Sequence, residues 1–144
     1  MQTLDTTARI EPERWNVVFS TKVTKWWVSL LAWGRFKHVW AFAYVSSRDC
    51  WLLYDVHMEG TRIAVIPDTL TNRAWMIEQI RDCEIIVMPR RKSSGVQFGF
   101  WCVTAVRHLV GVRCHALRPD ALWRSCLRNG GEIISATEGA RAQA

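Results

Sequence analysis

Short stretches in which apolar residues alternate or cluster dominate the chain, and most of them predict strands. Such stretches, rich in β-branched and aromatic side chains and bounded by polar or glycine-containing turns, are typical of sheet proteins. They lie at Trp15–Val23, Lys37–Val45, Cys50–Met58, Thr61–Ile66 and Cys83–Pro89. The second and third, joined by the polar turn Ser46–Asp49, predict a β-hairpin.

Helical spacing of apolar residues appears in the remaining segments. We expect helices over Lys25–Trp33, over Thr71–Arg81, in a short buried segment that carries Cys102 in its first turn and ends at Gly111, and over Pro119–Leu127. Gly34 and Gly111 follow the first and third, and Pro119 suits the first turn of the last. Together these elements predict the α+β fold class, with a small antiparallel sheet packed with a few helices.

A length of 144 residues predicts one domain with a single core. We expect residues 1–13 to be a loose leader, residues 14–134 the α+β core, and residues 135–144 a frayed tail. Residues 1–13 do not have the pattern of a signal peptide, and the apolar run Trp26–Trp33 is too short to cross a bilayer. We therefore expect synthesis in the cytoplasm and no transmembrane segment.

The composition is that of a globular protein, with 49% hydrophobic and 22% charged residues. The formal net charge of +6 is concentrated in the second half of the chain. Its basic residues there are Arg90, Arg91, Lys92, Arg107, Arg113, Arg118, Arg124 and Arg128. They form either a solvated face or a surface for an anionic partner, such as a cell-wall polymer, lipid or nucleic acid. No nucleic-acid-binding motif accompanies them, so nucleic acid ranks last among these partners.

Five cysteines, an odd number without a CxxC pair, argue against both a disulfide framework and a zinc ribbon. His108, Cys114 and His115 lack the spacing of a zinc finger. The sequence therefore predicts no metal site and no cofactor.

Cys102 stands out because it lies in the first turn of a predicted helix, where unpaired backbone N–H groups favour a thiolate. It is either a nucleophile or an ordinary buried residue. A hairpin turn centred on Ser47 and Arg48 places His38 opposite His57 and diagonal to Asp55. A thiol, an imidazole base and a group that orients the imidazole are the parts that thiol catalysis requires.

Four stretches make the sequence resemble a known family. They are KHVWAF (37–42), WLLYD (51–55), WCVTAVRHLVGV (101–112) and RPDALW (118–123), of which the last is similar to the helix after the cysteine helix in phage-encoded relatives. Their order resembles the circularly permuted NlpC/P60 group of papain-like cysteine peptidases and amidases. The resemblance covers about Trp15 to Leu127 and implies a permuted papain-like arrangement.

The resemblance implies that Cys102 is the nucleophile, His38 the general base and Asp55 the residue that orients His38, with His57 as the alternative third member. It also implies an oxyanion hole formed by the backbone N–H of Cys102, to which the Gln97 side chain would add a donor. Beside these residues, the other candidates are Trp40 and Trp101, which we expect to line a substrate groove.

The resemblance to phage-encoded relatives points to a peptide of the bacterial cell wall as substrate. An alternative from another functional class is a non-catalytic structural or adaptor component of a phage or phage-like particle, bound to other particle proteins. Ester or thioester cleavage and acyl transfer use the same three side chains, so the residues alone leave the reaction open.

Overall fold

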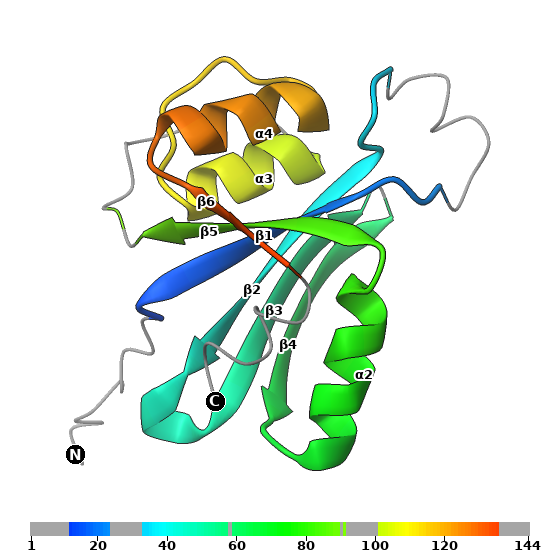
Figure 1. Ribbon diagram of the computed structural model, residues 1–144, viewed down its shortest axis with the longest axis vertical. Coiled ribbons are helices and arrows are strands. Elements are labelled where there is room, and N and C mark those ends of the chain that lie inside the picture. The colour runs from blue at the N-terminus through cyan, green and yellow to red at the C-terminus, as the bar shows by residue number, and fades with distance from the viewer. Residues whose placement is uncertain (1–11, 24–32, 58, 90, 92–100, 136–144) are drawn as a thin grey trace, which may run out of the picture.

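A six-stranded antiparallel sheet and three α-helices form an α+β fold in the computed structural model, which describes residues 12–23, 33–57, 59–89, 91 and 101–135 (Figure 1). The strands are β1 (Arg14–Ser20), β2 (His38–Val45), β3 (Cys50–His57), β4 (Gly60–Pro67), β5 (Cys83–Pro89) and β6 (Glu132–Ile134). The helices are α2 (Leu70–Ile80), α3 (Cys102–Leu109) and α4 (Pro119–Arg128), with the 3₁₀ turn η1 (Ser46–Arg48) between β2 and β3. The strand order is β4-β3-β2-β1-β5-β6, and each pairing is antiparallel.

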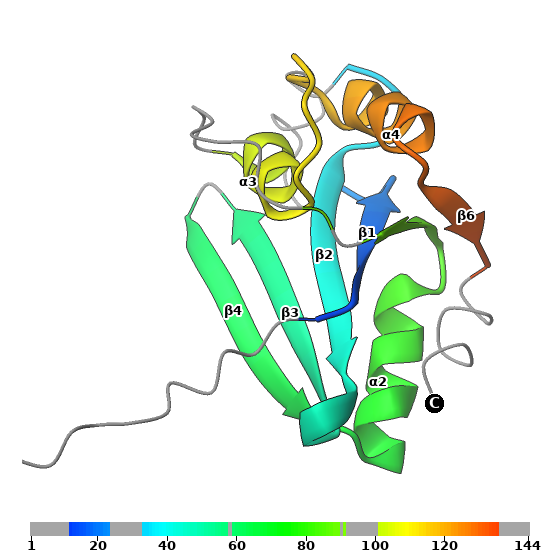
Figure 2. The same cartoon turned by 90° about the vertical axis from the view of Figure 1, so that its left-hand side faces the viewer.

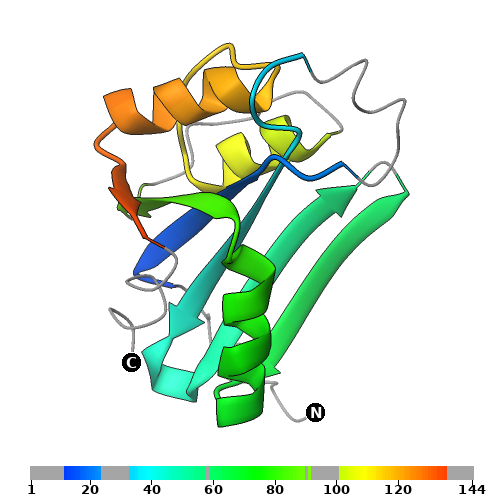
Figure 3. The same ribbon diagram turned by 45° about the vertical axis from the view of Figure 1, so that its right-hand side comes forward.

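Helices cover both faces of the sheet, because the side chains of a strand point alternately to its two faces. Val17, Val39 and Ile86 pack with α3 and α4, whereas Val18, Phe42 and Ile85 pack with α2. Figures 2 and 3 show α2 at one end of the long strands, and α3 and α4 at the other. The end that carries α3 is where β2 begins and β3 ends.

The hairpin register follows from a turn centred on Ser47 and Arg48, as the sequence predicts. The observed pairs run from Val45 opposite Cys50 to Ala41 opposite Tyr54. Asp49 adopts the left-handed conformation with φ 46°, which Asp tolerates better than most residues. This register brings the start of β2 beside the end of β3.

The observed elements depart from the sequence prediction in a few places. β1 ends at Ser20, three residues before the predicted end, because Ser20 is its last residue paired with β2 and β5. The short strand β6, which pairs with β5, was not predicted because three residues carry too little periodicity. The predicted helix Lys25–Trp33 lies almost wholly outside the described residues, as do most of the leader and of the tail.

Within the described part of the chain, no helix has both the length and the apolar character that a membrane span requires.

Candidate active site

The ends of three elements bring four sequence-predicted side chains together. His38 is the first residue of β2, Asp55 and His57 lie near the end of β3, and Cys102 is the first residue of α3. The helix packs against both strands, so the thiol approaches the histidine from a separate layer of the fold. His38 and Cys102 therefore lie close together in the fold, although more than sixty residues separate them in the sequence.

The Asp55 carboxylate lies between two imidazoles. Its Oδ1 is 2.7 Å from His38 Nε2, and its Oδ2 is 2.7 Å from His57 Nε2. The two rings are stacked, with centroids 4.8 Å apart and planes 11° apart. Asp55 is 14% exposed and His38 24%, whereas His57 is 52% exposed at the end of the strand.

Cys102 lies near enough to His38 to raise the pKa of its imidazole. Because Nε2 of this ring faces Asp55, Nδ1 is the nitrogen left for the thiol. Burial lowers the pKa of His38, but the hydrogen bonds with Asp55 and Cys102 outweigh it and raise that pKa to about 9. His38 is therefore protonated at neutral pH and lies between two acidic partners.

Asp55 is held in its charged form by its neighbours. Burial raises the pKa of its carboxyl, yet the hydrogen bond and positive charge of His38, together with those of His57, leave that pKa below its ordinary value. A charged carboxylate both orients the His38 ring and stabilises its protonated form.

The start of α3 supplies hydrogen-bond donors beside the thiol. Trp101 has an extended backbone (φ −124°, ψ 173°), and its carbonyl accepts bonds from the Ala105 N–H and the Thr104 hydroxyl. Because Cys102 is the first helical residue, its own N–H has no partner within the helix. This N–H can therefore stabilise negative charge on an oxygen next to the sulfur.

The loop before His38 is fastened to α4. The Asp120 carboxylate accepts hydrogen bonds from the N–H groups of Arg35 (3.0 Å) and Phe36 (3.3 Å). Gly34 permits this approach, since its φ is +126° and an added Cβ would lie 2.1 Å from Asp120 Oδ2. Glu84 of β5 forms a second tie, with an ion pair to Arg35 and a hydrogen bond from Trp123 of α4.

Two sequence predictions near the site are corrected. Trp40 does not line a groove, because it is only 8% exposed and packs in the core, 5.6 Å from the Phe42 ring. Trp101, 41% exposed, is the one of the two tryptophans available to a ligand beside Cys102. Arg107 does not belong to a basic surface, since it is 7% exposed and donates to the carbonyls of Cys114 and Ala116.

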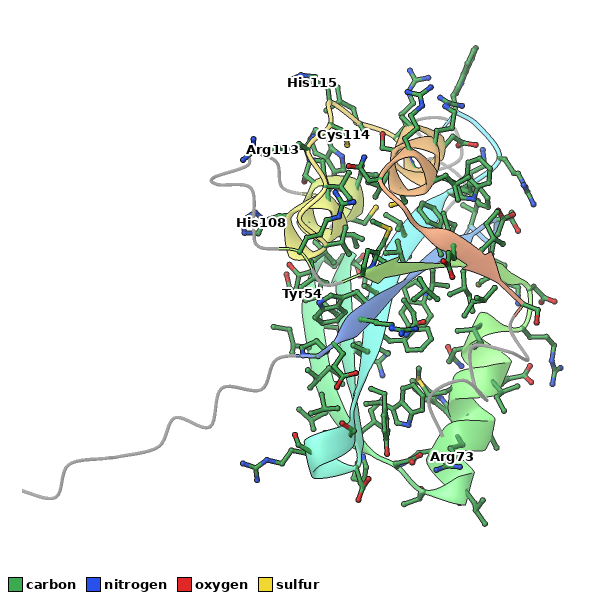
Figure 4. All side chains as sticks on the ribbon, turned by 60° about the vertical axis from the view of Figure 1, so that its left-hand side comes forward. Tyr54, Arg73, His108, Arg113, Cys114 and His115 are labelled. Carbon is green, nitrogen blue, oxygen red and sulfur yellow. The ribbon has the colours of Figure 1, made fainter. Side chains whose placement is uncertain are left out.

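The other residues that the sequence analysis singled out have separate outcomes. Gln97 lies outside the described residues. His108 is exposed and points away from the sheet on α3, close to the segment that carries Arg113, Cys114 and His115 (Figure 4). Among the other cysteines, Cys126 is buried, and burial raises the pKa of its thiol to about 12, so it is unreactive at neutral pH.

Sequence reasoning treated His57 as a substitute for Asp55, whereas the structure brings both to the site at once. The signal was present, because residues two apart on a strand point to the same face. Their side-chain ligand atoms and that of His38 lie within 4.8 Å of one another, which makes this cluster the candidate metal site among the described residues.

Comparison with known proteins found no match to a family, to a curated protein or to a solved structure. The chemistry of the site therefore rests on its geometry. A thiol beside an imidazole that is itself hydrogen-bonded to a carboxylate is able to form a nucleophile and to transfer its proton.

Proposed function

We propose that the protein is a cysteine hydrolase that cleaves an amide bond, with Cys102, His38 and Asp55 as its catalytic residues. The observation that carries the proposal is the arrangement of these three side chains: Asp55 is hydrogen-bonded to His38, and Cys102 lies near enough to raise the pKa of that histidine. The order of the elements, with the histidine strand before the cysteine helix, supports a permuted papain-like arrangement of the NlpC/P60 type.

In the acylation half of the reaction, Cys102 attacks the carbonyl carbon of the substrate as a thiolate, because its proton already lies on His38. The carbonyl π electrons move to oxygen, and the backbone N–H of Cys102 stabilises the resulting oxyanion. As the tetrahedral intermediate collapses, the C–N bond breaks and His38 gives its proton to the leaving amine. A thioester with Cys102 remains.

In the deacylation half, His38 takes a proton from a water molecule that attacks the thioester carbon. The C–S bond then breaks, the acid product leaves, and the proton returns to the sulfur or its ion pair with His38. Asp55 holds the ring in position through both halves and stays ionised, as the lowered pKa of its carboxyl requires.

The proposed substrate is a peptide of the bacterial cell wall. The formal charge of +6 favours an anionic polymer, and the exposed Trp101 offers an apolar surface beside the nucleophile. The protein would act either free or as part of a phage or phage-like particle.

Alkylation by iodoacetamide tests the nucleophile without knowledge of the substrate. We expect Cys102 to react much faster than the buried Cys50 and Cys126, and His38→Ala to slow its reaction, because the thiolate then loses its cationic partner. His108→Ala, which changes an exposed histidine of the same helix, is the matched control and should leave the rate unchanged.

Release of amine from cell-wall peptides tests the reaction itself, with Cys102→Ser as the inactive reference. Equal and slow alkylation of all five cysteines, together with no amine release, would contradict the hydrolase. A fixed stoichiometry in purified particles would then favour the structural or adaptor role.

A further inference from the structure

The hydrolytic mechanism leaves one member of the cluster unused. His57 takes no part in the proton transfers described above, yet its Nε2 lies 2.7 Å from Asp55 Oδ2 and its ring is stacked on His38. Of the four histidines in the chain, two therefore share one carboxylate. The two histidines lie at the start and the end of neighbouring strands.

Two imidazole nitrogens and a carboxylate oxygen are a ligand set for zinc and the neighbouring divalent transition metals. Mg²⁺ and Ca²⁺, by contrast, prefer sites made of oxygen atoms. A tetrahedral zinc ion with bonds of about 2.0 Å holds its ligand atoms about 3.3 Å apart. The separations in this cluster bracket that value, from 2.7 Å for the hydrogen-bonded pairs to at most 4.8 Å.

We propose that His38, Asp55 and His57 form a binding site for a divalent transition-metal ion such as Zn²⁺, and that the bound ion inhibits the hydrolase. The binding half stands on the cluster alone. The inhibitory half rests on the proposed function.

Inhibition follows from the two nitrogens of the His38 ring. The ion replaces the proton on Nε2, which is released to solvent, so the remaining ring proton lies on Nδ1. Nδ1 is the nitrogen that faces Cys102, and a metal-bound ring that released its Nδ1 proton would become an imidazolate. His38 can therefore no longer give a proton to the leaving amine. The ion also takes the Asp55 carboxylate away from its role as the partner of a protonated His38.

His57 makes the site accessible from outside. It is 52% exposed, whereas His38 and Asp55 are 24% and 14% exposed, so an ion arriving from solvent meets His57 first. The exposed ring also has room to turn as the hydrogen bonds are replaced by metal bonds. The substitution His57→Ala removes one ligand and leaves the contacts of His38 with Asp55 and Cys102 in place.

Titration of the metal-free protein with Zn²⁺ by calorimetry, and with Co²⁺ by visible absorption, tests the binding half. We expect one ion per chain and unchanged affinity in Cys102→Ser, whereas His57→Ala should weaken binding by at least about tenfold. His108→Ala and His115→Ala, which alter the other two histidines, are the controls and should bind as the wild type does. Circular dichroism of each variant shows whether it is folded.

The cobalt spectrum separates this site from an ion held by the thiol. Ligation by Cys102 would produce a thiolate-to-cobalt charge-transfer band, which we expect to be absent. The proposal is overturned if that band appears and binding disappears in Cys102→Ser, if folded His57→Ala binds as tightly as the wild type, or if no saturable binding occurs.

The inhibitory half has its own readout. Added Zn²⁺ should slow the release of amine from cell-wall peptides by the wild type and lose that effect in His57→Ala. An equal effect on both proteins would overturn the inhibitory half. Metal binding by a protein that proves to have no hydrolytic activity would contradict the proposed function and leave the metal site standing.

Discussion

Asp55 is the residue on which both proposals depend, because its two oxygens face two different imidazoles. Replacing it by Asn keeps the shape of the side chain and removes the negative charge that stabilises protonated His38. We expect Asp55→Asn to lower the rate of amide hydrolysis by about 10²–10⁴-fold, the usual contribution of general acid–base catalysis, and to slow alkylation of Cys102.

The control for this substitution is Asp82→Asn. Asp82 is 58% exposed, and its carboxylate forms an ion pair with Lys22, which is not a residue of the candidate site. Asp55→Asn with wild-type hydrolysis and alkylation would show that His38 needs no anionic partner.

Asp68 predicts how the stability of the fold depends on pH. Its carboxylate, only 5% exposed, accepts bonds from Arg73 and from the Trp51 indole N–H. The hydrogen bonds from Arg73 are the main reason that the pKa of Asp68 falls to about 2. Because the pKa is lower in the folded state than in the unfolded chain, this contribution to stability is complete above about pH 4 and is lost as the pH falls toward 2.

Urea unfolding of the wild type and Asp68→Asn at several pH values measures this contribution. We expect Asp68→Asn to be less stable at pH 7 and the difference between the two proteins to shrink below about pH 4. A difference that stays constant down to pH 2 would mean that the Asp68 charge does not stabilise the fold.

At the scale of elements, the loop between β1 and β2 is held by α4 through Gly34 and Asp120. Gly34→Ala should destabilise the protein and slow alkylation of Cys102, because the new Cβ would displace the Asp120 carboxylate and loosen the approach to His38. Gly60→Ala is the matched control, since Gly60 also has a positive φ (+152°) but an added Cβ there meets nothing within 4 Å. Equal losses of stability in the two variants would assign the whole effect to backbone strain.

Sequence patterns were informative where the contacts are local. The hairpin of β2 and β3 could be predicted from its polar turn and the alternation of its strands, and its observed register is that of a turn centred on Ser47 and Arg48. The hydrogen bond from the Arg35 N–H to Asp120 could not be predicted, because no sequence pattern connects two residues that are 85 positions apart. Trp40 was assigned to a groove from its closeness to His38 along the chain, although it packs against Phe42 and Met76 in the core.

At the scale of the molecule, the two cores on opposite faces of the sheet set the stability. Leu122 of α4 is fully buried in the core that also contains Val103 and Val106 of α3. We expect Leu122→Ala to lower the free energy of unfolding by about 2–5 kcal/mol through loss of packing and the cavity left behind. Leu117→Ala, at a leucine that is 63% exposed, should change it by no more than about 0.5 kcal/mol.

Urea denaturation measures both values. Similar effects of the two substitutions would mean that α4 is not packed as the structure has it.

The α+β class and the antiparallel sheet were predictable from strand and helix periodicity, whereas the strand order was not. Pairing of β1 with both β2 and β5 depends on contacts between segments far apart in the chain.

The tie between Arg35 and Asp120 has a consequence for how the protein is made. His38 is synthesised long before Cys102. The loop that precedes His38 is fixed by the Asp120 carboxylate, which lies 85 residues after Arg35 in the sequence. A nascent chain in which α4 has not yet been synthesised therefore contains both His38 and Cys102 but lacks the Asp120 hydrogen bonds that fix the loop before His38. The thiol would therefore stay inactive during synthesis until α4 has formed.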